Sequence, residues 1–310
     1  MGTGTMKIQK KKIFFLFVDG VGVGEPGNPI SDLFAPFIGP GKFHRQALPY
    51  RDSELYLKPI DARLGVPGLP QSGSGQTTIM TGVNAPRLLG YHLLAFPNEK
   101  LLPVIAERSI LKVLKEGGVR VSSANLYSHS FVEERRKRHR NMLPVSTLAI
   151  QAAEIPLRYQ EDYAAGKAVF ADITNEMLIR RGFPVQTLDP EGAARRILNI
   201  FDDQDFVFFE YFLTDTYGHN RDAERLRQAT SLLNDFLRSL WQQGREEISI
   251  LVTSDHGNAE DMSSGDHSLN GVPFFFLSSE LGRHLELCEQ VQDLTGIHPF
   301  IRDCFGVDHG

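Results

Sequence analysis

The chain has 310 residues, of which 41% are hydrophobic and 23% are charged, as is usual for a globular protein with a buried core. Its formal net charge of −5 gives no electrostatic reason to expect a nucleic acid or an anionic membrane surface as partner. The two cysteines, Cys288 and Cys304, match no metal-ligand spacing and argue against a disulfide framework, so we expect a reducing compartment.

The N-terminal region resembles a signal peptide only superficially. Lysines precede the apolar run Ile13–Val18, but the run is shorter than a secretory segment and ends at an aspartate followed by glycines. No later stretch approaches the ~20 apolar residues that a membrane span needs. We therefore predict a cytoplasmic protein without a membrane partner.

Strand and helix patterns alternate over most of the chain, which predicts an α/β fold with a mostly parallel sheet. Ile13–Val18 is apolar at every position, as expected for a central strand that is buried on both faces. A glycine-rich loop follows at residues 20–27. The later expected elements are helices at 76–81, 109–116, 190–200 and 221–241 and strands at 119–126, 206–213, 248–253 and 274–277.

The segment from about residue 132 to 184 interrupts this alternation. We predict a single domain over residues 1–310 with a small lid insertion at 132–184. The insertion contains a basic cluster from Arg135 to Arg140. This cluster could hold a second anionic group of a substrate, or it could be the solvated face of a lid helix.

Metal-ligand side chains follow three of the predicted strands. Asp19 follows the first strand, and Asp215 and His219 follow the strand at 206–213. Asp255 and His256 follow the strand at 248–253, and His267 precedes the last strand. Open α/β sheets place functional groups at the carboxyl ends of their strands, so these side chains predict one dinuclear metal centre. Oxygen and imidazole ligands without a thiolate suit Zn²⁺ or Mn²⁺, with Mg²⁺ possible but less suited.

A serine-rich stretch precedes the helix predicted at 76–81. Ser72 and Ser74 stand among glycines there, and a hydroxyl at a helix N-terminus can serve an anion site or simply cap the helix. Beside a dinuclear centre, we interpret the serine as a nucleophile aimed at phosphorus.

Together these motifs resemble the alkaline phosphatase superfamily. The motifs are Asp19-Gly20, Ser72 to Gly82, Thr214-Asp215-x-x-Gly218-His219, Asp255-His256-Gly257-Asn258 and His267-x-x-Asn270-x-Val272-Pro273. Within it they are most similar to the metalloenzyme branch that contains cofactor-independent phosphoglycerate mutase and phosphopentomutase. The resemblance covers roughly residues 10–90 and 200–310 and implies an alkaline-phosphatase-like three-layer sandwich with a mostly parallel central sheet.

The resemblance also implies roles for individual residues. Asp215, His219 and His267 would bind one divalent ion. Asp19, Asp255 and His256 would bind the other, with Ser72 as an additional ligand and as the catalytic nucleophile. Ser72 is favoured because it stands ten positions before Gly82, but the loop departs from the mutase pattern and leaves Ser74 open.

The predicted function is metal-dependent phosphoryl transfer from a small-molecule phosphate ester through a phosphoserine. Hydrolysis is favoured over mutase activity, because the insertion is much shorter than the second domain of cofactor-independent phosphoglycerate mutase. It also offers no counterpart of that domain's substrate-binding arginine and aspartate cluster. A phosphomutase of phosphoglycerate or a sugar phosphate is the alternative, and a non-catalytic metal-binding protein is the hypothesis from another class. The sequence makes no prediction of the oligomeric state.

Overall fold

The computed structural model describes residues 12–128 and 143–308. Their strands form one seven-stranded sheet in the order β2-β3-β7-β6-β1-β5-β4. The bounds are β1 Ile13–Val18, β2 Tyr50–Arg51, β3 Leu55–Ile60, β4 Val121–Ser123, β5 Phe206–Tyr211, β6 Ser249–Thr253 and β7 Val272–Leu277. The basic cluster from Arg135 to Arg140 lies outside the described residues.

The central strands run parallel to one another. Strand β1 pairs in parallel with β5 and β6, and β4 pairs in parallel with β5. Strand β7 is antiparallel to both β6 and β3, so β3 again points in the same direction as β1. The short edge strand β2 is antiparallel to β3. The prediction of a mostly parallel α/β sheet is therefore confirmed.

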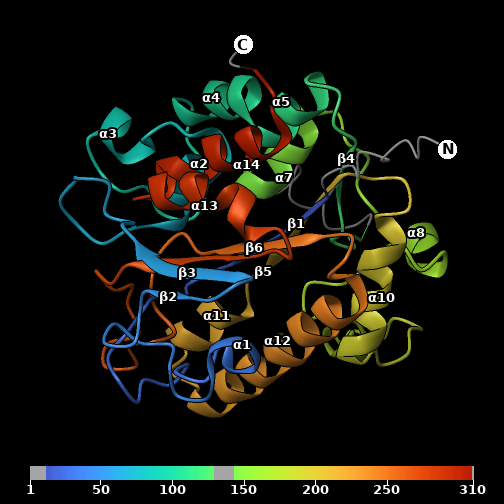
Figure 1. Cartoon of the computed structure of the whole chain (residues 1–310), viewed down its shortest axis with the longest axis horizontal. Helices are drawn as coiled ribbons and strands as arrows, with labels where there is room; N and C mark the ends of the chain where they lie inside the picture. The colour runs from blue at the N-terminus through green and yellow to red at the C-terminus, as the bar shows by residue number, and fades with distance from the viewer. Residues whose placement is uncertain (1–11, 129–142, 309–310) are drawn as a thin grey trace, which may run out of the picture.

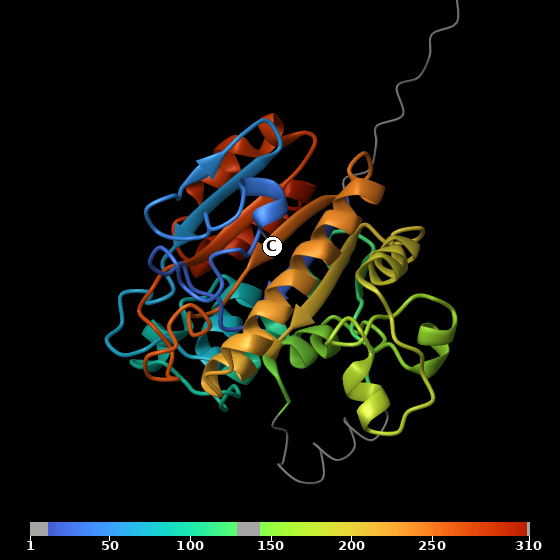
Figure 2. The same cartoon turned by 90° about the horizontal axis from the view of Figure 1, so that it is seen from below.

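Helices cover both faces of this sheet, as Figure 1 shows. The layer at the top of that view holds α2 Ser72–Thr81, α4 Leu101–Arg108, α5 Ile110–Glu116, α7 Val145–Ala152, α13 Leu281–Gln290 and α14 Ile297–Phe305. The opposite layer holds α1 Ala35–Ile38, α10 Pro190–Ile200, α11 Leu213–His219 and α12 Ala223–Gly244. Seen from below, α12 runs across the face of the sheet (Figure 2). The predicted three-layer sandwich is thus the observed architecture.

The alternation of side chains along β1 explains why the molecule has a core on each side of the sheet. Phe14 and Leu16 point into the core beneath α10 and α12, whereas Phe15 and Phe17 point into the core beneath α2 and α14. All six side chains of β1 are buried. A strand that is apolar at every position therefore lies in the middle of the sheet, as the sequence predicted.

The segment predicted as an insertion divides into two parts in the described residues. Its helix α7 packs into the layer of α2, α4 and α5 through buried residues such as Val145 and Ala149. The remaining helices are α8 Gln160–Ala164 and α9 Glu176–Arg180. A separate small apolar cluster of Leu126, Ala168 and Leu178 supports this second part. The helices not yet named are α3 Ala85–Leu89 and the single 3₁₀ turn η1 Leu294–Gly296.

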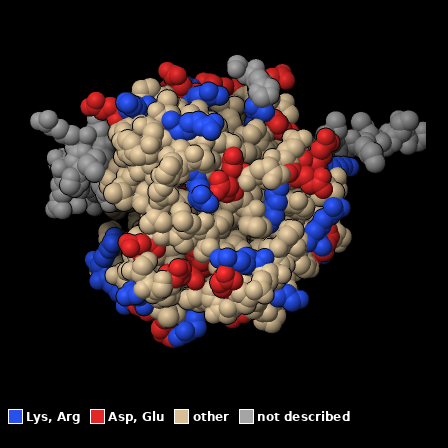
Figure 3. All heavy atoms as spheres, turned by 90° about the vertical axis from the view of Figure 1, so that its left-hand side faces the viewer, with Lys and Arg blue, Asp and Glu red and all other residues tan. Residues whose placement is uncertain are grey.

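The surface and the helices give two further observations. On the face shown in Figure 3, Lys and Arg side chains are interspersed with Asp and Glu side chains among the described residues. No helix within residues 12–128 and 143–308 combines the length and the apolar character that crossing a bilayer requires.

Candidate metal centre

The carboxyl ends of three neighbouring parallel strands bring the predicted ligands to one edge of the sheet. Asp19 directly follows β1, and Asp255 and His256 follow β6 after one intervening residue. On the other side of β1, strand β5 leads into α11, which carries Asp215 and His219. Because β6, β1 and β5 are adjacent and parallel, their ends meet at the same place.

The first ligand group consists of Asp19, Asp255 and His256. The Nε2 atom of His256 lies 3.4 Å from Asp19 Oδ1 and 3.5 Å from Asp255 Oδ2. The side chains of His256 and Asp255 are wholly buried. One ligand atom from each of the three residues lies within 4.8 Å of the others, a spacing that one cation can bridge.

The electrostatics of this group suit a cation. Burial, and after it the negative charges of Asp255 and Asp215, raises the pKa of Asp19 well above its usual value. Asp19 Oδ1 is buried and accepts no hydrogen bond from the described residues. A buried carboxylate oxygen without a donor is costly unless a positive charge compensates it. The donor set therefore fits a divalent ion.

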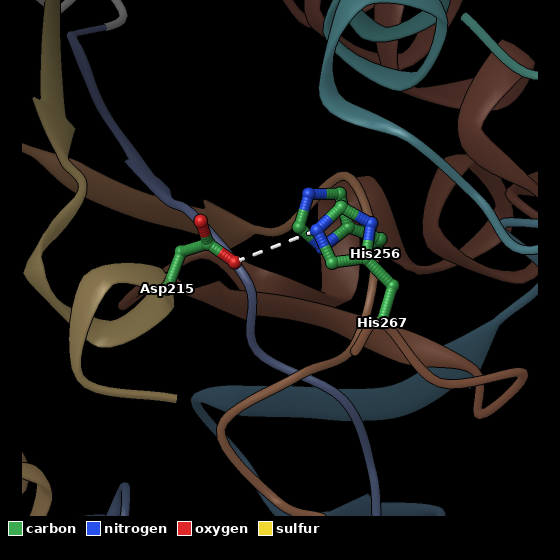
Figure 4. Close-up of side chains that lie close together, drawn as sticks. All are labelled: Asp215, His256 and His267. Carbon is green, nitrogen blue, oxygen red and sulfur yellow. Dashed lines mark ion pairs between the residues drawn. The ribbon is translucent and has the colours of Figure 1, made fainter. Parts of the chain in front are cut away.

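The second ligand group, as predicted, consists of Asp215, His219 and His267. The structure instead brings ligand atoms of Asp215, His256 and His267 within 4.8 Å of one another, and His219 is outside that group. His219 Nε2 lies 3.3 Å from Asp215 Oδ2, and His267 Nε2 lies 3.2 Å from His219 Nε2. The distance from His267 Nε2 to Asp215 Oδ1 is 3.8 Å. Figure 4 shows this last pair, together with the ring of His256 beside that of His267.

Backbone carbonyls orient both histidines of the second group. The Nδ1 atom of His219 lies 2.8 Å from the carbonyl oxygen of Gly265, and that of His267 lies 2.7 Å from the carbonyl of Pro70. A carbonyl can only accept, so each Nδ1 carries a proton. The other ring nitrogen, Nε2, then faces Asp215, and it becomes available to a metal ion once it has lost its proton.

The pKa values in this second group reflect the same contacts. The hydrogen bond to Asp215 is the main reason that the pKa of His219 rises to about 9. Although burial raises the pKa of Asp215, its hydrogen bond to His219 and the neighbouring His256 bring it to about 2. Burial lowers the pKa of His267, and the proximity of His256 lowers it further.

The two ligand groups are in contact at His256, which belongs to the first group and packs against the second. Its ring stacks on that of His267, with centroids 3.5 Å apart and planes 15° apart. Asn258 Nδ2 donates to Asp215 Oδ1 at 2.8 Å, which ties the loop after β6 to α11. A Cβ atom at Gly218 would lie 2.6 Å from Asn258 Oδ1, so this contact requires glycine there. All six predicted aspartate and histidine ligands thus lie together.

The two candidate nucleophiles have different surroundings. Ser72 Oγ lies 2.9 Å from His256 Nε2, at the first position of α2. Ser74 is fully buried, where its hydroxyl donates to the carbonyl of Gln71 and accepts from the backbone N–H of Leu93. Ser72 is therefore the serine whose hydroxyl faces the ligand groups.

Helix α2 begins earlier than the sequence predicted, at Ser72 rather than at Gln76. Gln76 is consequently one turn after Ser72 on the same helical face. Its Nε2 donates to Asp255 Oδ2 at 3.1 Å and to Asp19 Oδ2 at 3.4 Å. Sequence reasoning gave Gln76 no role, although the four-residue spacing from Ser72 was a usable signal.

Glu260 is a second residue that the sequence analysis missed. Its Oε2 accepts the backbone N–H groups of Gly22 and Asn258, each at 2.9 Å. Its Oε1 accepts the hydroxyl of Ser268 and the side-chain amide of Asn270. The buried carboxylate therefore joins the loop after β1 to the connection between β6 and β7, in which Glu260 itself lies.

Two cavities adjoin Ser72. The larger has a volume of about 780 Å³ and is lined by Asp19, Ser72, Asp215 and parts of α7 and α9. Glu210, near the end of β5, also lines this cavity. Burial raises the pKa of its carboxyl group to about 7. The smaller, of about 240 Å³, is bounded by Ser72, Asp215, His219 and His267 among others. A ligand could thus reach the centre from either side.

Known proteins resemble the chain in sequence and in fold. Residues 171–309 match the family model of the Metalloenzyme superfamily. The 2,3-bisphosphoglycerate-independent phosphoglycerate mutase of Thermococcus kodakarensis is 26% identical over 187 residues, which cover 54% of this chain and 43% of that protein. The phosphopentomutase of Pseudothermotoga lettingae is 27% identical over 120 residues, covering 38% of this chain and 31% of that protein. The chain spans less than half of the length of these relatives.

The alkaline phosphatase of the Antarctic bacterium TAB5 shares the fold, with a TM-score of 0.54 and 14% identity over 97% of this chain and 100% of the other. These comparisons confirm the resemblance to the alkaline phosphatase superfamily and to its metalloenzyme branch. The matching family model describes metalloenzymes, and the structure contains two groups of side chains that could hold a metal ion, Asp19 with Asp255 and His256, and Asp215 with His256 and His267.

Proposed function

We propose that this protein is a metal-dependent phosphoryl-transfer enzyme that acts on a small phosphate ester through a phosphoserine at Ser72. The observation that carries the proposal is the position of the Ser72 hydroxyl, 2.9 Å from His256 and at the mouth of both cavities. The mutases and the phosphatase among the similar proteins are in keeping with this chemistry.

The proposed centre holds two divalent ions, Zn²⁺ or Mn²⁺ by the chemistry of the ligands, with Mg²⁺ as a possible substitute. One would be bound by Asp215, His219 and His267, and the other by Asp19, Asp255 and His256 with Ser72. When bound, the ions would neutralise the negative charge that an in-line displacement at phosphorus develops.

The residues of the chain supply the nucleophile and the geometry. Ser72 Oγ forms a bond to phosphorus as the bond between phosphorus and the ester oxygen breaks, which leaves a phosphoserine and an alcohol. Water then cleaves the phosphoserine, which restores the hydroxyl and releases inorganic phosphate. Gln76 donates to both Asp19 and Asp255 and so holds these two carboxylates in place near Ser72.

We favour hydrolysis because a mutase must hold its product while the phosphoryl group returns to another hydroxyl. Cationic side chains usually provide that grip on a phosphorylated product. In the described residues that line the larger cavity, Arg181 is the one cationic side chain. The alternative, a phosphomutase, is supported by the two mutases to which the chain is similar.

The test of the proposal is turnover of p-nitrophenyl phosphate with added Mn²⁺ or Zn²⁺. We expect Ser72→Ala to lower kcat by roughly a thousandfold or more, since the nucleophile itself is removed. Ser74→Ala is the matched control one half-turn away and should retain kcat within about tenfold. Mass spectrometry of quenched wild-type enzyme should show one added phosphoryl group on the peptide that contains Ser72.

Two results separate the alternatives. Conversion of a sugar phosphate or a phosphoglycerate into its isomer without release of inorganic phosphate would identify a mutase. Bound metal without turnover on a broad panel of phosphate esters would indicate a non-catalytic metal-binding protein. Equal activity of the Ser72→Ala variant and the wild type would contradict the assignment of the nucleophile.

We also propose a single domain with a lid insertion near residues 132–184, and a cytoplasmic location. The shared sheet supports the first proposal. The second is supported by the cysteine content, which is two residues in a chain of 310 and is too low for a disulfide framework.

A further inference from the structure

The larger cavity has room for more than a phosphate group. Its volume of about 780 Å³ falls within the range of roughly 300–1,000 Å³ that is typical of small-molecule sites. Ser72 and Asp215 line it beside the reacting centre, and Phe170 and Met177 line it within the segment that follows α7. An ester bound at Ser72 would therefore extend its organic group toward that segment.

Much of the lining is apolar. The large apolar and aromatic side chains that border the cavity are Phe96, Leu126, Tyr127, Phe170, Met177 and Phe212. Apolar surface that faces water in an open cavity is unfavourable, and a ligand with apolar surface gains free energy by covering it. Aromatic rings also stack on flat ligand groups.

The charged side chains of the cavity wall also bear on which organic group the cavity accepts. Arg181 stands alone as a cation in the lining that the structure describes, and Glu210 adds a carboxyl group rather than a second cation. A carboxylate or second phosphate on the substrate would need paired cations for its desolvation to be offset. The described lining, which does not include the basic cluster from Arg135 to Arg140, therefore suits an organic group without charge.

We propose that this cavity selects phosphate esters whose organic group is uncharged, carries apolar or aromatic surface, and is larger than a three-carbon acid. The inference depends on the proposed phosphoryl transfer at Ser72. It narrows the substrate class of that reaction and disfavours phosphoglycerates as substrates.

The first experiment compares esters with the same kind of leaving group. Both 2-phenylethyl phosphate and ethyl phosphate are primary alkyl esters, so their intrinsic reactivity is similar. With the Mn²⁺-loaded full-length enzyme, we expect kcat/KM for the phenylethyl ester to be about tenfold higher or more, because a phenyl ring is buried. Glycerol 3-phosphate should likewise be preferred over 3-phosphoglycerate, which has the same number of carbons and an added carboxylate.

The second experiment assigns the preference to the cavity wall. Phe170→Ala and Met177→Ala should each raise KM for the phenylethyl ester several-fold and change kcat/KM for ethyl phosphate less than about twofold. Phe183→Ala is the matched control, since Phe183 is an exposed aromatic residue of the same segment and is absent from the cavity lining. Calorimetric binding of 3-phenylpropylphosphonate and propylphosphonate gives the same comparison without turnover.

The outcomes distinguish this inference from the proposed function. Equal kcat/KM for the phenylethyl and ethyl esters, or a preference for 3-phosphoglycerate, would overturn the inference and leave phosphoryl transfer intact. If wild-type enzyme with Mn²⁺ or Zn²⁺ cleaves none of the esters, the proposed function fails, and this inference fails with it. A phenylethyl preference that is lost in the two wall variants and retained in Phe183→Ala would establish it.

Discussion

Individual side chains at the centre are held by contacts that leave their metal-binding atoms directed inward. His219 and His267 each use Nδ1 on a backbone carbonyl, and His256 directs Nε2 toward Asp19 and Asp255. Such hydrogen bonds fix the tautomer and the ring plane, and they reduce the entropy lost when a ligand binds. The residues thus form a centre that needs little rearrangement to accept a cation.

A histidine away from the centre makes the stability of the fold sensitive to acid. His298 on α14 is buried, and this burial together with the nearby positive charges of Arg302 and Arg108 lowers its pKa from 6.5 to about 4. Between pH 6.5 and 4 the unfolded chain therefore binds a proton that the folded chain does not. His298 stabilises the fold fully above pH 6.5, and that contribution is lost as the pH falls toward 4.

We predict that His298→Gln flattens the dependence of unfolding free energy on pH over this window. Between pH 6.5 and pH 4, the difference in unfolding free energy between the variant and the wild type should change by about 3 kcal/mol at most. Urea unfolding at several pH values, with a chelator present, measures it. Parallel pH profiles for the two proteins would show that His298 does not titrate as described.

Among the elements, hydrogen bonds tie the loop after β1 to the connection between β6 and β7. The carboxylate of Glu260, which lies in that connection, accepts hydrogen bonds from Gly22 after β1 and from Asn258, Ser268 and Asn270 in its own segment. All four partners are donors, so an amide in place of the carboxylate would turn its NH₂ group toward other N–H or O–H groups.

The variant Glu260→Gln should therefore destabilise the fold by about 1–3 kcal/mol and weaken metal binding. Chemical denaturation and calorimetric titration with Mn²⁺ measure the two effects. Glu246→Gln serves as the control because Glu246 has an exposed side chain distant from these loops in sequence. Unchanged metal affinity in Glu260→Gln would mean that the two segments hold their positions without this carboxylate.

The sequence predicted the elements whose patterns are local and strong. Strand β1 has the predicted bounds, and α10 and α12 differ from the predicted helices by at most a few residues. Helix α11 is absent from the helices predicted from the sequence, and Thr214, Asp215 and Gly218 are weak helix formers. In the helix, Asp215 and His219 are four residues apart and share a face, which brings their side chains to 3.3 Å from each other.

Other features depend on contacts between distant segments and could not be predicted. The insertion of β7 between β3 and β6, in antiparallel orientation, has no signal in the sequence of β7 itself. The contacts of Glu260 likewise depend on the folded position of the loop after β1 beside the connection between β6 and β7. The six ligands could be proposed because each stands beside a predicted strand. Their convergence on one edge depends on the order of β6, β1 and β5.

In the molecule as a whole, the sheet lies between two helical layers, and the ligand groups lie at the carboxyl ends of its central strands. The larger cavity extends from these groups to the segment after α7, so the proposed chemistry and the proposed substrate selection would involve different parts of the fold. Because the proposed ligands come from the loop after β1, from α11 and from the connection between β6 and β7, bound metal should stabilise the whole molecule. Mn²⁺ or Zn²⁺ should raise the Tm of the metal-free protein, and the rise should be smaller in Asp19→Asn.

Two divalent ions in neighbouring ligand groups are proposed, and the metal content of the purified protein tests this proposal. Elemental analysis of purified wild-type protein, after loading and removal of free metal, should give about two ions per chain. Asp215→Ala and Asp255→Ala, one from each ligand group, should each bind roughly one ion fewer while remaining folded. Metal content in both variants equal to that of the wild type would contradict the proposed centre.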